Sequence, residues 1–142
     1  MSFYLRFRNL LLILMLHCTF SLVCGQNIRE QPMRWRSSQA VSLGNQEITA
    51  LPSTFAINSN GTIVWDQKNG KRTTTFEVNA VRGEWTNIQN EGEIAYDVKA
   101  GNVTGTLEFS KKDEQLFILM KLTSNGKPDL QYSFTVDGFE LL

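Results

Sequence analysis

Apolar and polar residues alternate with a period of two along most of the chain after residue 46. In one such run, Phe76 and Val78 are apolar whereas Glu77 and Asn79 are polar. This alternation is typical of β-strands in a sheet that buries one face and exposes the other. The runs that follow the pattern are 54–58, 62–66, 72–81, 92–99, 103–110, 115–123 and 130–137.

Short turns separate these runs, and Asn-Gly pairs occupy three of the turns, at residues 60, 69 and 125. Asn-Gly favours tight hairpin turns, which need positive φ. Strands joined by such turns are antiparallel neighbours. We therefore expect an all-β fold, an antiparallel meander that forms a small barrel or a two-layer sandwich. Seven runs are clear, and either 39–43 or 139–142 would supply an eighth strand.

The segment 26–46 is polar with scattered apolar residues and has no sustained period. Pro32 argues against a helix through it. We therefore expect an N-terminal arm or linker over 26–46, with one short strand at 39–43. A single antiparallel β domain is expected over 47–142, because a chain of this size buries one working core without disulfides.

Residues 1–25 have the pattern of a secretory signal peptide. Two arginines precede an uncharged apolar run over 10–23, which is shorter than the roughly 20 residues of a membrane span. Small residues before the cut favour cleavage between Gly25 and Gln26, which would give a secreted or periplasmic protein. The alternative is cleavage before Cys24 with a lipid on its sulfur, which would anchor the protein to a membrane.

The run 115–123 breaks the alternation because it is apolar on both faces. Phe117 and Leu119 stand on its outer face, where other strands carry polar residues. Apolar residues on both faces indicate that both faces are covered. Either the N-terminal arm covers the outer side, or Phe117 and Leu119 form a surface for a partner or ligand. The candidate covering residues in the arm are Met33, Trp35, Val41 and Leu43.

Removal of 25 of the 142 residues leaves 117 residues without cysteine or histidine. These absences exclude a Ser-His-Asp triad and a zinc site of ordinary ligands. No Gly-rich phosphate loop is present, and we expect no catalytic residue, metal or cofactor. A carboxylate-only hydrolase passes these exclusions, with Glu84, Glu91 and Glu93 beside Trp85. The remaining 12 basic and 14 acidic residues argue against a nucleic-acid partner.

Aromatic residues are frequent in this chain and have two interpretations. They would fill a small β core or, in a closed barrel, line a cavity for one apolar small molecule. The candidate lining residues are Trp65, Trp85, Tyr96 and Tyr132. Asn60 and Asn102 begin Asn-X-Thr sequences at predicted turns, which would be glycosylation acceptors in a eukaryotic protein.

These patterns predict an exported, non-catalytic β module that binds an apolar small molecule or a protein partner, the latter at Phe117 and Leu119. Membrane association is expected only for a form lipidated at Cys24. The alternative is a structural or accessory subunit of a cell-envelope assembly, because the strand 136–142 can be an edge that pairs with another chain. The carboxylate-only hydrolase is the third possibility.

Overall fold

The computed structural model describes residues 27–125, 127 and 129–142. The expected signal peptide, with its cleavage point at Gly25 and Gln26 and the alternative lipid site at Cys24, lies outside the described residues. Within this part of the chain, no helix has the length and apolarity needed to cross a membrane. Its strands are β1 (Met33–Ser42), β2 (Ile48–Ile57), β3 (Thr62–Gln67), β4 (Arg72–Arg82), β5 (Gly92–Ala100), β6 (Val103–Lys112), β7 (Gln115–Ser124), β8 (Leu130–Thr135) and β9 (Gly138–Leu141).

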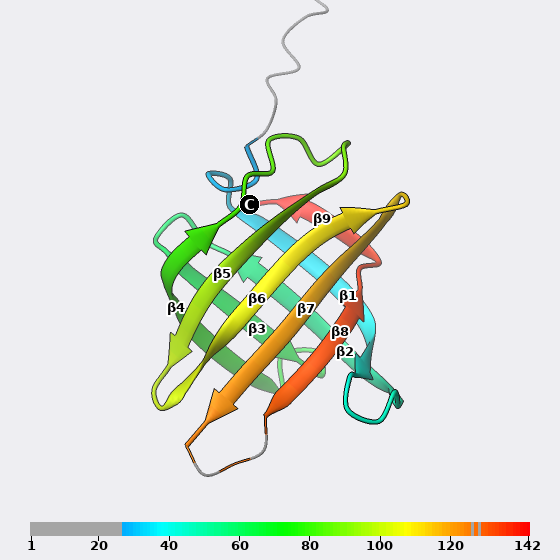
Figure 1. Ribbon diagram of the computed structural model, residues 1–142, viewed down its shortest axis with the longest axis vertical. Coiled ribbons are helices and arrows are strands. Elements are labelled where there is room, and N and C mark those ends of the chain that lie inside the picture. The colour runs from blue at the N-terminus through cyan, green and yellow to red at the C-terminus, as the bar shows by residue number, and fades with distance from the viewer. Residues whose placement is uncertain (1–26, 126, 128) are drawn as a thin grey trace, which may run out of the picture.

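The strands form one antiparallel sheet in the order β2-β3-β4-β5-β6-β7-β8-β1-β9. Because β1 also pairs with β2, the first eight strands close into a barrel (Figure 1). This topology confirms the predicted antiparallel meander and selects the barrel over the sandwich. At the β3–β4 turn, Asn69 and Gly70 adopt positive φ values of 59° and 81°, as the Asn-Gly signal predicts.

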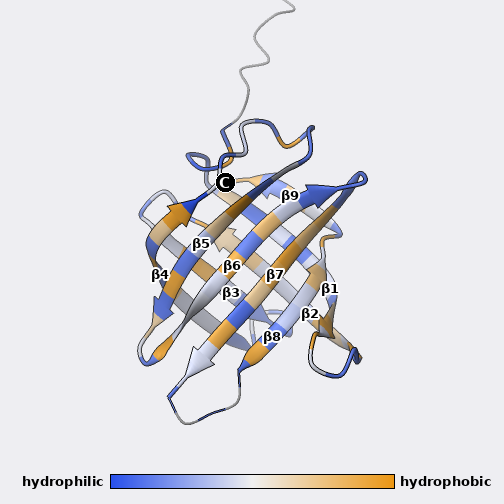
Figure 2. Cartoon of the chain, in the orientation of Figure 1, coloured by the Kyte–Doolittle hydropathy of each residue, from blue (hydrophilic) through white to orange (hydrophobic). Residues whose placement is uncertain are grey.

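Alternation along the strands separates a buried inner face from a more polar outer face (Figure 2). On β5, Ile94, Tyr96 and Val98 are buried in the barrel. Between them, Asp97 lies on the outer face, where its carboxylate accepts a hydrogen bond from Arg82 at 2.7 Å. The period-two pattern therefore identifies the core face of this strand.

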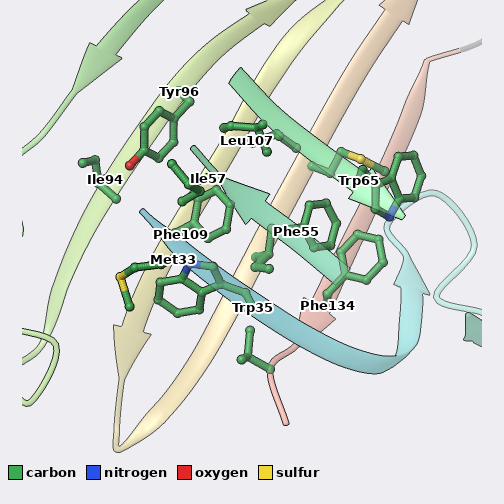
Figure 3. Close-up of a cluster of buried hydrophobic side chains, with 14 of the residues drawn as sticks. Met33, Trp35, Phe55, Ile57, Trp65, Ile94, Tyr96, Leu107, Phe109 and Phe134 are labelled. Carbon is green, nitrogen blue, oxygen red and sulfur yellow. The ribbon is translucent and has the colours of Figure 1, made fainter. Parts of the chain in front are cut away.

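Aromatic rings pack against one another across the interior (Figure 3). The ring centroid of Phe109 lies 5.3 Å from that of Trp35 and 6.3 Å from that of Phe55. Phe55 in turn lies 5.1 Å from Phe134 and stacks on Trp65 with an interplanar angle of 7°. These contacts join side chains from facing walls of the barrel.

The segment 26–46 differs from the expected arm, because residues 33–42 of it form strand β1, which is longer than the short strand expected at 39–43. Met33 and Trp35 are fully buried in the core, so the expectation that they cover the outside of the barrel is wrong. Arg34 lies between them and Arg36 follows Trp35, both on the outer face. Residues 33–36 therefore alternate between the buried inner face and the outer face with a period of two. The two arginines and the preceding Pro32 make this period hard to recognise in the sequence.

Candidate functional site

Strands β8 and β9 follow one another along the same edge of β1. Ala40 of β1 pairs with Phe134 of β8, and Trp35 pairs with Phe139 of β9. Both pairings have the same register, so β8 and β9 are two parts of one long strand. The interruption lies opposite the part of β1 between Ser37 and Gln39, where the register of β1 against β2 shifts.

Hydrogen bonds hold the chain to β1 at this interruption. The buried Ser37 hydroxyl lies 2.7 Å from the Thr135 carbonyl oxygen and 2.8 Å from that of Gln39. The N–H of Asp137 donates to the carbonyl of Arg36 at 2.8 Å. The interruption therefore leaves β9 attached to β1.

Strand β7 is too short to cover β9. It begins after a tight hairpin turn in which Asp113 and Glu114 have φ values of 49° and 63°. Its pairing with the β8 side ends where the N–H of Val136 donates to the carbonyl of Leu116 at 2.9 Å. Among the described elements β9 contacts only β1, so its second side is an unpaired strand edge.

The backbone groups on this unpaired side come from alternate residues. Leu142 donates its N–H to the carbonyl of Pro32 at 3.0 Å. Because backbone groups alternate in direction along an antiparallel strand, Glu140 also turns its N–H and C=O toward β1. Those of Phe139 and Leu141 point the other way, away from β1.

The side chains of Phe139 and Leu141 lie on the inner face of the sheet, since these residues pair with Trp35 and Met33. They are nevertheless 37% and 48% exposed, whereas Trp35 and Met33 are fully buried. The Phe139 ring is 5.7 Å from that of Trp35. The inner-face side chains stay exposed because no described strand follows β9 in the sheet. We call Phe139, Leu141 and their free backbone groups the β9 edge.

One charged side chain separates the two apolar residues of the β9 edge. Glu140 projects from the outer face and forms an ion pair with Arg34 at 2.9 Å. Both side chains are more than two-fifths exposed, so the pair adds little to stability. It does place a neutralising guanidinium beside the carboxylate of this edge.

The loop between β4 and β5 covers the same end of the barrel. Trp85 in this loop is buried, with its ring 6.0 Å from that of Trp35. Its indole N–H lies 3.0 Å and 3.1 Å from the carbonyl oxygens of Asn87 and Asn90, and its own carbonyl accepts from the Ile28 N–H at 2.9 Å. These bonds hold Trp85 over the core as a plug.

Three buried polar groups lack hydrogen-bond partners among the described residues. They are the side-chain oxygen of Gln31, the indole N–H of Trp35 and the hydroxyl of Tyr96. Both rings pack against Phe109. Burial raises the pKa of Tyr96 to about 12, although the positive charge of Arg29 acts in the opposite direction. Unpartnered buried groups of this kind call for a physical explanation.

The structure separates the predicted binding residues into two groups. Those directed to the interior are Trp65, Trp85, Tyr96 and Tyr132. Phe117 and Leu119 lie on the outer face of β7, where they are half-buried and pair with Ser110 and Glu108 of β6. The pKa of Glu108, the partner of Leu119, is raised, mainly because the carboxyl group is partly buried and also because of the negative charge of Glu93. No single site among the described residues unites the two groups.

Phe139 and Leu141 are the site residues that sequence reasoning missed. The expected strand 139–142 places them on an edge, but the same alternation fits two ordinary core positions. They are exposed because β7 is too short to cover them. The start of β7 is set by the β6–β7 hairpin turn, which is distant from residues 139–141 in the sequence.

A groove of about 370 Å³ lies where β1, β2 and β3 meet the start of β9. Arg36, Asp66 and Asp137 give it groups of both charge signs. The groove offers hydrogen-bonding groups to a polar ligand. The unpartnered groups of Trp35 and Tyr96 do not line it.

The acids considered for hydrolysis are all exposed. Glu91 accepts a hydrogen bond from the backbone of Asp113 at 2.9 Å, and Glu93 projects from the outer face of β5. Glu84 lies exposed in the loop beside Trp85. This arrangement does not favour a shared acid pair. In the described part of the chain, no three His, Cys, Asp or Glu side chains gather as a metal site.

No protein-family model matches the chain, and a search of the curated proteins finds no match.

Proposed function

We propose that this protein is an exported, non-catalytic binding module that recognises an extended polypeptide segment by strand addition at the β9 edge. The exposure of Phe139 and Leu141, inner-face side chains beside an unpaired backbone, carries this proposal. In strand addition, backbone hydrogen bonds supply affinity and alternate side chains supply specificity. The proposed export rests on the N-terminal sequence pattern.

The β9 edge defines the chemistry of the segment that it would bind. The added strand would take the position of a longer β7. Its alternate side chains would face Phe139 and Leu141, so we expect apolar residues at every second position. The intervening side chains would lie beside the Arg34–Glu140 pair, where polar groups are favoured.

Selection from a displayed library of random octapeptides tests strand addition. We expect the enriched peptides to have alternating apolar residues and to lose at least about tenfold in affinity for Leu141→Lys, since an edge lysine opposes pairing. Ile48→Lys is the matched control, because Ile48 is 66% exposed and pairs with Val41, at the end of β1 opposite to the β9 edge. Equal binding to wild type and Leu141→Lys would refute the proposal.

A second candidate function is the binding of a small molecule beneath Trp85. The unpartnered groups of Trp35 and Tyr96 favour it, because a ligand with hydrogen-bonding groups would satisfy them. Because the buried Trp85 lies against Trp35 at this end of the core, a ligand entering here would have to displace Trp85. Native mass spectrometry should then show a retained adduct that Tyr96→Phe weakens. A spectrum with the polypeptide mass alone would argue against this candidate.

A further inference from the structure

The β9 edge is complementary to a second copy of itself. Consider two β9 strands that run antiparallel with Glu140 at the centre. Phe139 of each copy then lies opposite the partner's Leu141. Because the backbone groups of both residues point away from β1, each opposed pair can exchange two hydrogen bonds, which satisfies all the free groups of both edges.

We propose that the segment bound at the β9 edge is β9 of another copy of this chain, in a two-fold symmetric dimer. This inference rests on the proposed function and names its partner. In this dimer, the sheet of one barrel continues into the sheet of the other. The partner's β9 takes the position beside β9 that a longer β7 would occupy.

The side chains agree with this pairing. Phe139 and Leu141 lie on the same face, so antiparallel pairing brings both from each copy into one apolar cluster. The cluster continues the core, since Phe139 already contacts the buried Trp35. The dimer would thus cover inner-face apolar surface that β7 leaves open.

The charges on the outer face also permit the pairing. Glu140 of one copy would stand opposite the partner's Glu140, and like charges directly opposed across strands are destabilising. Each carboxylate, however, is held at 2.9 Å by its own Arg34. Across the two copies, the order of charges is Arg34, Glu140, the partner's Glu140 and the partner's Arg34. This row has no net charge, and its two arginines compensate for the repulsion between the central carboxylates.

The topology closes the assembly at two copies. Each of β1 to β8 has a neighbour on both sides in the barrel, and β9 is the terminal strand of the described sheet. A contact between two identical edges consumes both of them and is closed by two-fold symmetry. We therefore expect dimers without filaments. Their affinity should be weak, in the micromolar-to-millimolar range, because four-residue strands form a small interface.

Cysteine trapping tests the register of the proposed dimer. The two copies of residue 140 would form a non-hydrogen-bonded pair with Cα atoms about 4.5 Å apart, within the separation that disulfides span. In a full chain with Cys18→Ser and Cys24→Ser, we expect Glu140→Cys to form a covalent dimer at least about tenfold faster than Ile48→Cys. Equal rates of cross-linking would overturn the register.

Sedimentation equilibrium of the full chain tests the association itself. We expect a concentration-dependent dimer for wild type and Ile48→Lys, and a monomer for Leu141→Lys with an unchanged far-ultraviolet circular dichroism spectrum. Wild-type monomer up to millimolar concentration would overturn the dimer. If library peptides still bind wild type and not Leu141→Lys, strand addition stands while the dimer fails. Without such peptide binding, both proposals fail.

Discussion

Replacing Tyr96 by phenylalanine should stabilise the protein at neutral pH. The residue is 2% exposed, and its hydroxyl has no partner in the described part of the chain. Folding therefore takes this hydroxyl out of water without a replacement bond, at a cost of about 1–3 kcal/mol. Tyr96→Phe keeps the ring that packs 5.6 Å from Phe109 and removes the cost. We expect the free energy of unfolding to rise by about 1–2 kcal/mol.

The same hydroxyl makes the stability depend on pH in alkali. Burial raises the pKa of Tyr96 from 10.0 to about 12 in the folded protein. Between these two pH values the unfolded chain loses the proton first, so stability falls as the pH rises. A difference of this size corresponds to about 3 kcal/mol, which is fully retained below pH 10 and lost as the pH passes 12. Tyr96→Phe should lack this loss.

Urea unfolding followed by tryptophan fluorescence measures both effects, at neutral pH and in steps between pH 10 and pH 12. The difference between wild type and variant removes the contributions of other groups that titrate in this range. Tyr132→Phe is the matched control, because it removes a hydroxyl from a half-buried ring and should change stability by about 0.5 kcal/mol or less. Destabilisation of Tyr96→Phe at neutral pH would refute the reasoning and indicate that a bound molecule satisfies the hydroxyl.

Two further substitutions test the packing around the core. Ser53→Ala should cost about 1–3 kcal/mol in urea unfolding, because it removes the acceptor of the buried Trp65 indole N–H, which lies 3.2 Å from the serine oxygen; an unchanged midpoint would contradict this. Gly92→Ala should displace Trp85, because an added Cβ would clash with the indole ring, and should shift the tryptophan emission to longer wavelength. Gly44→Ala, which has open space around the added Cβ, should leave the emission unchanged.

The fold could be predicted from the sequence because apolar and polar residues alternate along most of the strands β2 to β8. The prediction was less accurate where the alternation is weak. β2 begins at Ile48, well before the predicted start, because its first residues are exposed on both faces. The sequence predicts an arm over most of β1 because this segment is polar and locally basic without a sustained period, although Arg34 and Arg36 occupy ordinary outer-face positions.

The candidate site could be predicted only in part, because it depends on non-local geometry. The sequence predicts strands at 130–137 and 139–142, but not that they share one register on β1. The exposure of Leu141 follows from where the β6–β7 hairpin turns, at Asp113 and Glu114. Neither relation is encoded near residue 141. The assignment of a binding surface to Phe117 and Leu119 stays a prediction.

The chemistry of β9 itself argues that its edge is paired in the functional protein. Closed barrels remove strand edges, and natural sheets protect the edges they keep with lysine, proline or inward-pointing charge. β9 has none of these protections on its inner face, where it carries Phe139 and Leu141. Its one charged residue, Glu140, points outward and is already paired with Arg34. An apolar edge without protection is a liability for a monomer, whereas a specific partner strand would cover both the backbone groups and the exposed side chains.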